Sequence, residues 1–347
     1  MKKFMAAERD EAILRGLEFL YRASCDPEYF DLYGFDLLFC FYCISSTSKD
    51  KRLSREARRM GRERAQHWRR EHATIPPDAE ASDIVHLAIG SLAADKLGVR
   101  DRAFKPQIRQ AAARFKPEDY LGFDPSIEAP PDDVPGICSC GAENPRGRKT
   151  CRQCKRRLTM LGRYGAWLDA LIRSYMGERY GVILGAPYAE VIKWLPLMRP
   201  YRGAEDGDNP NFYWTVYAIT HVVYTLNDYN TYKLSPRWLP DEFEFLQTNL
   251  KEAVACEDSE MMGEFLDTLK AFGLSDNHPL IRQGVEYVLS QQNADGSWGD
   301  IETEDVYQRY HPTYTAIDGL RDYAWRGTKT CFPELLPLLK RWASGKD

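Results

Sequence analysis

The sequence predicts an all-α protein in which six helical hairpins close into an (α/α)6 barrel, or toroid. Apolar residues recur with the 3.6-residue period of helices along most of the chain, and strand signals are few. An amphipathic helix followed by a more uniformly apolar one also recurs, first over 12–43 and again over 280–320. Hairpins that cannot bury their apolar faces alone must stack, either in a ring or in an open superhelix. The buried inner helices favour the ring.

The hairpins are expected near residues 7–46, 52–97, 103–178, 187–232, 240–274 and 279–325, with a short last helix from about Pro333. In each hairpin the first helix is polar on one side, and the second is richer in apolar and aromatic residues. We therefore expect an outer and an inner layer. The first half of the toroid is predicted over 1–124, a linker with an inserted zinc ribbon over 125–158, and the second half over 159–347.

The composition is that of an ordinary soluble globular protein. The chain has 347 residues, 44% of them hydrophobic and 28% charged, which suffices for a substantial core. A net charge of −4 argues against nucleic acid as the main partner. The N-terminus has no signal-peptide pattern, and no apolar run is long enough to span a membrane. We expect a cytoplasmic protein without a membrane span.

Four of the nine cysteines are clustered, which indicates metal ligands rather than disulfides. Cys138 and Cys140 are separated from Cys151 and Cys154 by a short polar segment, a spacing typical of a four-thiolate zinc site. Because four thiolates leave no open position, the Zn²⁺ is expected to be structural. The segment resembles the zinc-ribbon module, although the first pair of that module is usually Cys-x-x-Cys. Basic residues surround the cysteines, so the ribbon is also a candidate surface for docking a protein partner.

Three inner helices carry a polar residue at the same phase. His221 and His311 each begin the pattern His-x-x-Tyr-Thr, and Glu264 begins Glu-x-x-Asp-Thr on the helix between them. In a ring, equivalent positions on neighbouring inner helices point to the same place. The three side chains are therefore expected to converge on a central cavity. Extending the alignment backwards adds His86, Asp36 and Asp169 as further candidates on the same wall.

Two histidines and one carboxylate suit a catalytic metal, either Fe²⁺ or Zn²⁺, and a site that included His86 would leave Cu and Mn open as well. The positions three residues after these ligands are candidates for acid–base or hydrogen-bonding roles: Tyr224, Asp267 and Tyr314. The alternative for each histidine is an ordinary core residue bonded to a neighbouring tyrosine or carbonyl group.

Two segments near the C-terminus resemble known families. The loop from Gln291 and Gln292 to Asp295-Gly296-Ser297-Trp298 resembles the repeat motif of squalene and hopene cyclases. The following Tyr310-His311-Pro312-Thr313-Tyr314, with Gly319-Leu320 after it, resembles the protein prenyltransferase β-subunit. Both families have the α/α toroid, and in the second the corresponding histidine is a ligand of the catalytic zinc. The resemblance thus implies the toroid and a metal-binding role for His311.

The chain departs from both families at their catalytic residues. The prenyltransferases place an aspartate and a cysteine thiolate just before an inner helix, where this chain has Met261-Met262-Gly263-Glu264. The Asp-x-Asp-Asp motif of the triterpene cyclases is also missing. We therefore expect the toroid to be retained and the chemistry to differ.

These patterns together predict a metal-dependent enzyme that acts on an apolar or aromatic small molecule in a central cavity. The sequence leaves open whether the reaction is an oxidation by an oxidase or oxygenase, or that of a cyclase, lyase or transferase. The alternative from another class is a non-catalytic toroid that binds a peptide or lipid and docks a partner through the ribbon.

Overall fold

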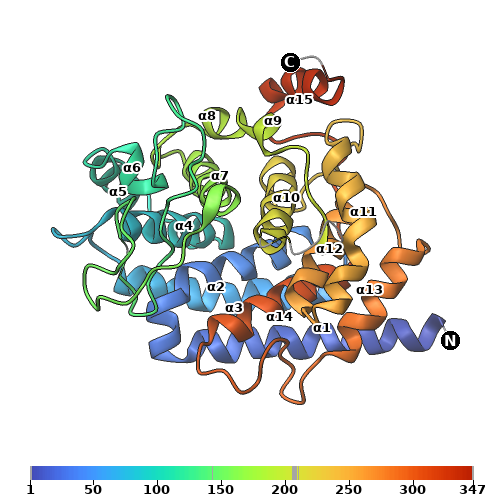
Figure 1. Cartoon of the computed structure of the whole chain (residues 1–347). Helices are drawn as coiled ribbons and strands as arrows, with labels where there is room; N and C mark the ends of the chain where they lie inside the picture. Colours follow the sequence, from blue (N-terminus) through green and yellow to red (C-terminus); the bar gives the residue numbers. More distant parts are fainter. Residues whose placement is uncertain (1, 143, 205–208, 210, 346–347) are drawn as a thin grey trace. The chain divides into compact units, whose positions relative to one another are not determined.

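A computed structural model describes residues 2–142, 144–204, 209 and 211–345. The described residues are predominantly helical (Figure 1). The β pairing among them is limited to isolated β-bridges. This confirms the prediction of an all-α protein.

Each interval predicted for a hairpin contains helices. The first two hairpins are α1 (Lys2–Cys25) with α2 (Pro27–Thr47) and α3 (Lys51–Glu71) with α4 (Ala81–Leu97). The third and fourth are α5 (Phe104–Ala112), α6 (Pro117–Leu121) and α7 (Gly162–Tyr180), then α8 (Tyr188–Ile192), α9 (Leu195–Met198) and α10 (Phe212–Asn227). The last two are α11 (Pro240–Ala255) with α12 (Ser259–Ala271) and α13 (Pro279–Ser290) with α14 (Tyr307–Leu320). A 3-10 turn (Pro333–Leu335) and α15 (Leu336–Ala343) follow.

The turns between several helices are set by local chemistry. Asp26, Asp50 and Asp258 are N-cap residues whose carboxylates accept hydrogen bonds from backbone N–H groups in the first turns of α2, α3 and α12. The chain preceding α7 and the chain preceding α10 form short helices where the sequence predicts one longer helix each. Pro117 and Pro196 stand in the first turns of α6 and α9, where a proline, which has no N–H to donate, is tolerated at the start of a helix but not inside one.

The chain forms two compact units. Unit 1 comprises Met1–His72, Ala93–Arg100 and Leu226–Asp347, and unit 2 comprises Ala73–Leu92 and Asp101–Thr225. The linker and ribbon predicted over 125–158 lie wholly in unit 2.

In unit 1, α12 and α14 cross at very short range (Figure 1). A Cβ atom on Gly263 would lie 2.5 Å from the backbone oxygen of Thr315, and one on Gly319 would lie 2.9 Å from the Cα of Gly263. Only glycine leaves enough space for this contact. The crossing sets the positions of Glu264 and His311, which belong to these two helices.

The loop between α13 and α14 fastens α14 to the first helix of the chain. Trp298 is fully buried and donates its indole N–H to the carbonyl oxygen of Val288 at 2.7 Å. Gln292 donates to the carbonyl oxygen of Ala12 in α1 at 2.8 Å. Gly296 has a φ of +92°, and a Cβ at this position would lie 2.7 Å from the carbonyl oxygen of Arg15. The Gln-x-x-x-Asp-Gly-Ser-Trp motif is thus a structural clamp between the two ends of unit 1.

The end of α14 is also joined to the end of α2. Arg321 is 2% exposed, donates from Nε to Asp318 at 2.7 Å, and donates from Nη1 to the Thr47 hydroxyl at 2.9 Å. A bridge between Ser48 and Tyr323 lies beside this cluster. The first and last hairpins are therefore in direct contact.

In unit 2, the short helices α6 and α8 pack against α7. Trp167 is fully buried and donates to the carbonyl oxygen of Val191 in α8 at 2.9 Å. The hydroxyl group of Tyr188 lies 2.7 Å from that of Thr225 at the end of α10. Trp194 donates to the carbonyl oxygen of Pro125, which holds the start of the linker against α9.

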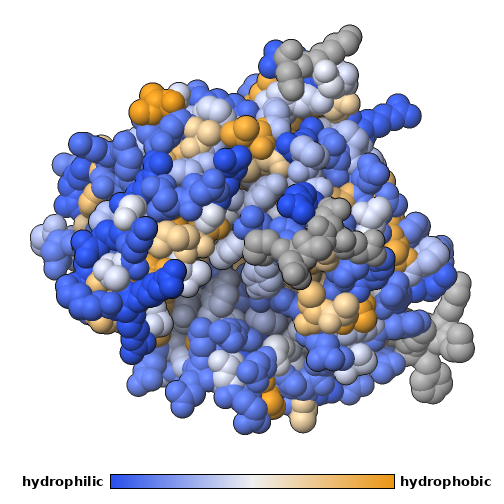
Figure 2. Space-filling model, in the orientation of Figure 1, coloured by the Kyte–Doolittle hydropathy of each residue, from blue (hydrophilic) through white to orange (hydrophobic). Residues whose placement is uncertain are grey.

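Figure 2 shows a face on which hydrophilic residues predominate and apolar residues occur in small separate groups. Among the described residues, no helix combines the length and apolar character that crossing a bilayer requires.

Candidate functional site

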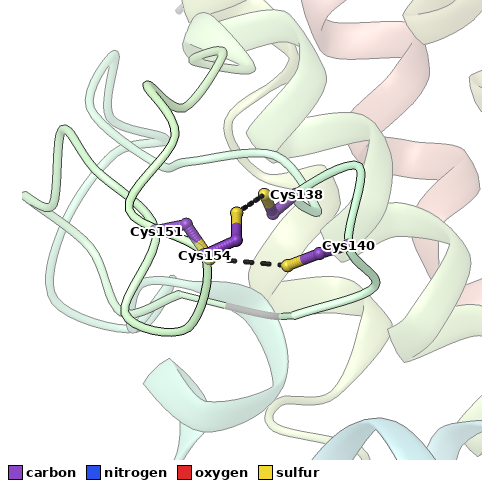
Figure 3. A group of neighbouring side chains, drawn as sticks. All are labelled: Cys138, Cys140, Cys151 and Cys154. Carbon is purple, nitrogen blue, oxygen red and sulfur yellow. Dashed lines mark hydrogen bonds between the residues drawn. The ribbon is translucent and has the colours of Figure 1, made fainter.

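The four cysteines of the ribbon form a compact cluster (Figure 3). Their sulfur atoms all lie within 4.8 Å of one another, with 3.4 Å between Cys138 and Cys154 and 3.7 Å between Cys140 and Cys151. Four thiolates about 2.3 Å from a tetrahedral zinc ion would lie about 3.8 Å apart. The residues thus fit a zinc ion, and the shorter Cys-x-Cys spacing of the first pair does not prevent the four sulfurs from meeting.

Two tight turns present these sulfurs. In the first, the N–H of Gly141, whose φ is +80°, donates to the carbonyl oxygen of Cys138 at 2.8 Å. In the second, the N–H of Cys151 donates to the carbonyl oxygen of Arg156 at 2.8 Å. The side chain of Asn144 joins the two turns, because it donates to the carbonyl oxygen of Ala142 at 2.9 Å and accepts from the N–H of Arg152 at 2.7 Å.

The second turn favours a thiolate at Cys151 but not at Cys154. The backbone N–H of Arg156 lowers the pKa of Cys154, but the thiol of Cys138 and burial outweigh it and raise this pKa to about 11. Burial raises the pKa of Cys151, but backbone N–H groups at Cys154 and Gln153 outweigh it and lower this pKa to about 6. A thiol that ionises near neutral pH is a ready metal ligand. With all four positions filled by protein, the cluster can hold a metal such as zinc but offers no place for a substrate.

A second polar cluster surrounds His311 on one wall of unit 1, formed by α2, α12 and α14. The Nδ1 atom of His311 lies 3.0 Å from Glu260 Oε1, and the two side chains are only 16% and 14% exposed. The contact is an ion pair and not an aligned hydrogen bond. Beside it, the hydroxyl group of Tyr310 donates to Asp36 Oδ2 at 2.9 Å. The ring of Tyr307 stacks on the imidazole, with 4.8 Å between centroids.

The carboxylates of this cluster control the charge of the histidine. Burial lowers the pKa of His311, but Glu260, Asp36 and Glu264 outweigh it and raise this pKa to about 9. The pKa of Asp36 is itself raised by burial, although His311 and Tyr310 oppose that shift. Without a metal, His311 is therefore an imidazolium ion at neutral pH.

The predicted metal ligands are divided between the units. Glu264, which is 1% exposed, and His311 lie in unit 1, whereas His221 and His86 lie in unit 2. The Nδ1 atom of His221 lies 2.9 Å from the carbonyl oxygen of Tyr217. Burial and then Arg173 lower the pKa of His86 to about 4, which keeps its imidazole neutral at physiological pH. The convergence of these residues on one metal stays a prediction.

The predicted acid–base residues are buried. Tyr224 and Tyr314 are 6% and 9% exposed, and burial raises the pKa of Tyr314 well above its usual range. Asp267 is 1% exposed and accepts a hydrogen bond from Asn230 at 2.8 Å. Burial, followed by the nearby charge of Asp318, raises its pKa to about 7. Asp267 could therefore exchange a proton near neutral pH.

Of the two further candidates, Asp36 belongs to the His311 cluster of unit 1, and Asp169 lies in unit 2. Asp169 lies 3.7 Å from Arg173, and burial raises its pKa. Glu260 was not predicted as a partner of His311. The available signal was its place one helical turn before Glu264, on the same helix face.

Comparisons with family models, with curated proteins and with solved structures were made for the whole chain. None of them found a match. The two clusters therefore have to be interpreted from their own chemistry.

Proposed function

We propose that the chain is a metal-dependent enzyme in which His221, Glu264 and His311 bind a catalytic Fe²⁺ or Zn²⁺ ion, with His86 as a fourth candidate. The observation that carries the proposal is the environment of the Nδ1 atoms of His221 and His311. Glu260 faces Nδ1 of His311, and a backbone carbonyl oxygen faces Nδ1 of His221. An oxygen atom beside Nδ1 favours a proton on that nitrogen, so each ring would keep its proton on Nδ1 and present Nε2 to a metal. Histidine ligands of metals are commonly oriented by such a second contact.

The charge around His311 supports the same proposal. Three carboxylates, those of Glu260, Asp36 and Glu264, influence a single imidazole. Ionised carboxylates in a largely buried place require cations or protons. A divalent ion would supply that charge and would displace the proton from Nε2 of His311. When bound, it would act as a Lewis acid or activate water or oxygen.

The residues around the histidines suggest the type of substrate. Tyr307 stacks on His311, and the ring of Tyr224 lies edge-on to His221 with 5.2 Å between centroids. Aromatic rings beside a metal site favour an apolar or aromatic small molecule. Asp267 and Tyr314 are the proposed proton donors or acceptors. The burial of both and the raised pKa of Asp267 support this role.

The (α/α)6 toroid belongs to the same proposal. It is supported by the contact of α14, in the last hairpin, with α1 and α2, in the first. An open superhelix would hold its first and last hairpins apart.

The deciding experiment is the metal content of the purified protein. The proposal requires two metal ions per chain, one in the ribbon and one that is lost in His221→Ala and in His311→Ala. His67→Ala is the matched control. The Nε2 atom of His67 lies 2.9 Å from Glu71 on the same helix, α3, which is not one of the helices of the His311 wall. A single zinc ion per chain that only Cys151→Ser or Cys154→Ser releases would overturn the proposal.

A second candidate function is that of a binding module, in which the chain takes up a peptide or lipid and docks a protein partner through the ribbon. The observation that favours it is the exposed positive charge of the ribbon, whose residues 155–157 are all cationic and exposed.

A further inference from the structure

We propose that the ribbon, residues 138–158, binds an acidic polypeptide segment of a partner protein, and that this segment also carries an aliphatic side chain. The inference deepens the second candidate function by naming the chemistry of the partner. It does not depend on the catalytic metal, because it concerns a different part of the chain.

The first support is a large excess of positive charge. The ribbon contains seven basic residues and one acidic residue, Glu143, which lies outside the described residues. Arg146 pairs with Glu128 and Asp133, and Arg152 lies 3.4 Å from Glu80. These two arginines attach the ribbon to the rest of unit 2.

The other basic residues of the ribbon are exposed and have no ion pair among the described residues. They are Arg148, Lys149, Lys155, Arg156 and Arg157. Figure 2 shows strongly hydrophilic residues over the loops that follow α6, on the left of the view. Their charge is therefore available to a partner.

The second support is that the backbone beneath these residues is fixed. The N–H of Cys151 donates to the carbonyl oxygen of Arg156, and the N–H of Leu158 donates to that of Lys149 at 3.0 Å. Arg156 also donates to the hydroxyl group of Ser139 at 2.9 Å, across the two turns. A basic surface held in place by the zinc turns loses little backbone entropy when a partner binds.

The third support is an apolar side chain beside the basic ones. Ile137 is 66% exposed. The N–H of the preceding Gly136 donates to the carbonyl oxygen of Thr159 at 2.8 Å, which places Ile137 next to the segment that carries Arg157. An aliphatic side chain in the bound segment would cover it. An isoleucine side chain has neither a hydrogen-bond donor nor a charge with which to bind a phosphate group of a nucleic acid.

These features favour an acidic polypeptide over a nucleic acid. Residues 138–158 include no aromatic side chain on which a base could stack. The chain as a whole carries a net charge of −4, which repels a long polyanion. A short acidic segment can contact the ribbon alone.

The test uses the full-length zinc-loaded protein and fluorescence anisotropy. The probes are a fluorescein-labelled oligoglutamate peptide that contains leucine, the same peptide with serine for leucine, and a labelled single-stranded oligothymidylate of equal charge. We expect the leucine-containing peptide to bind at least about tenfold more tightly than the oligonucleotide. The serine peptide should bind more weakly than the leucine peptide.

A charge-reversed variant, R148E/K149E/R156E/R157E, should weaken peptide binding at least about tenfold. The matched control is R52E/R55E/R58E/R62E, which reverses the same number of exposed basic residues on α3. It should leave the affinity unchanged. Ile137→Ser should abolish the preference for the leucine peptide, and the zinc content of each variant shows whether the ribbon is still folded.

Three outcomes would overturn the inference: equal or tighter binding of the oligonucleotide, equal loss in the α3 control, or no binding of either peptide. A zinc-containing I137S variant that kept its preference for leucine would also overturn it. None of these results depends on whether His221 and His311 bind a metal. The catalytic proposal is therefore tested separately, by metal analysis.

Discussion

The ribbon and the His311 wall are both clusters of potential metal ligands, but they are built in opposite ways. The ribbon takes its four sulfurs from one short segment, Cys138 to Cys154, and neighbouring backbone N–H groups position them. The His311 wall takes its groups from α2, α12 and α14, so Asp36 and Tyr310 meet although they are 274 residues apart. The cysteine cluster of the ribbon depends on its local turns, whereas the wall depends on helix packing throughout unit 1.

The difference also concerns charge. Soft thiolates in a closed tetrahedral set are suited to hold a metal permanently. The His311 wall combines carboxylates with a histidine that is protonated in the absence of a metal. Removing a ligand should therefore unfold the ribbon locally, whereas disturbing the packing of unit 1 should displace the wall without affecting the ribbon.

Cys151→Ser should have the largest effect on the ribbon. A structural zinc ion contributes on the order of 10 kcal/mol to the folding of a small module, so its loss should leave the ribbon unfolded. We expect one fewer zinc ion per chain and new proteolytic cleavage within 138–158, with the far-ultraviolet circular dichroism of the helices kept. Cys256→Ser, which changes an exposed cysteine outside the cluster, should alter neither measurement.

Trp298→Ala should have the largest effect on the wall. It empties a fully buried site and removes the hydrogen bond to Val288, at a cost of about 3–5 kcal/mol in the free energy of unfolding. Urea unfolding of unit 1 would measure it. Leu32→Ala, at a position of unit 1 that is 60% exposed, should cost less than about 1 kcal/mol. An equal effect of both changes would contradict the role given to the loop clamp.

Gly263→Ala should have an intermediate effect on the free energy of unfolding of unit 1. Its Cβ would meet the backbone oxygen of Thr315 at 2.5 Å, and separating α12 from α14 should cost about 1–3 kcal/mol. The control is Gly136→Ala, where the nearest atom would be at 3.4 Å and little change in urea unfolding is expected. Unchanged stability of the Gly263 variant would mean that the crossing can relax.

The smallest expected effect on stability is that of deprotonating His311. Its pKa is raised from the ordinary value of 6.5 to about 9, so the stability contributed by its ion pair is complete below pH 6.5 and is lost as the pH rises through 9. In the metal-free protein, the histidine ε1 proton signal that disappears in His311→Gln should titrate near pH 9. Glu260→Gln should lower this midpoint, and Glu286→Gln, at an exposed position, should not. A midpoint near 6.5 in the unmodified protein would contradict the ion pair.

The helices and the cysteine cluster could be predicted because both are local. The apolar period marks a helix such as α2, and the spacing of Cys151 and Cys154 marks a metal turn whatever the rest of the chain does. The pairing of His311 with Glu260 could not be predicted in the same way. It depends on the crossing of α12 and α14, which brings Glu260 as well as Glu264 towards the histidine. A phase alignment cannot tell which of two residues one helical turn apart on the same face lies nearer to the histidine.

The Gln292–Trp298 loop was identified as a motif, but its physical role required the structure. Its partners are Ala12 and Arg15, nearly three hundred residues earlier in the chain, and no local pattern indicates such a contact. The same holds for Arg321, whose partners Thr47 and Ser48 lie at the end of α2.

The contact of α14 with α1 also sets the order of events during synthesis. A ribosome adds about 5–20 residues per second, so α1 has to wait many seconds for the helix against which it packs. The four cysteines of the ribbon span one short segment, so they can come together as soon as Cys154 has left the ribosome. The His311 wall can assemble only after α14 has left the ribosome, and until then the apolar face of α2 lacks one of its covering helices.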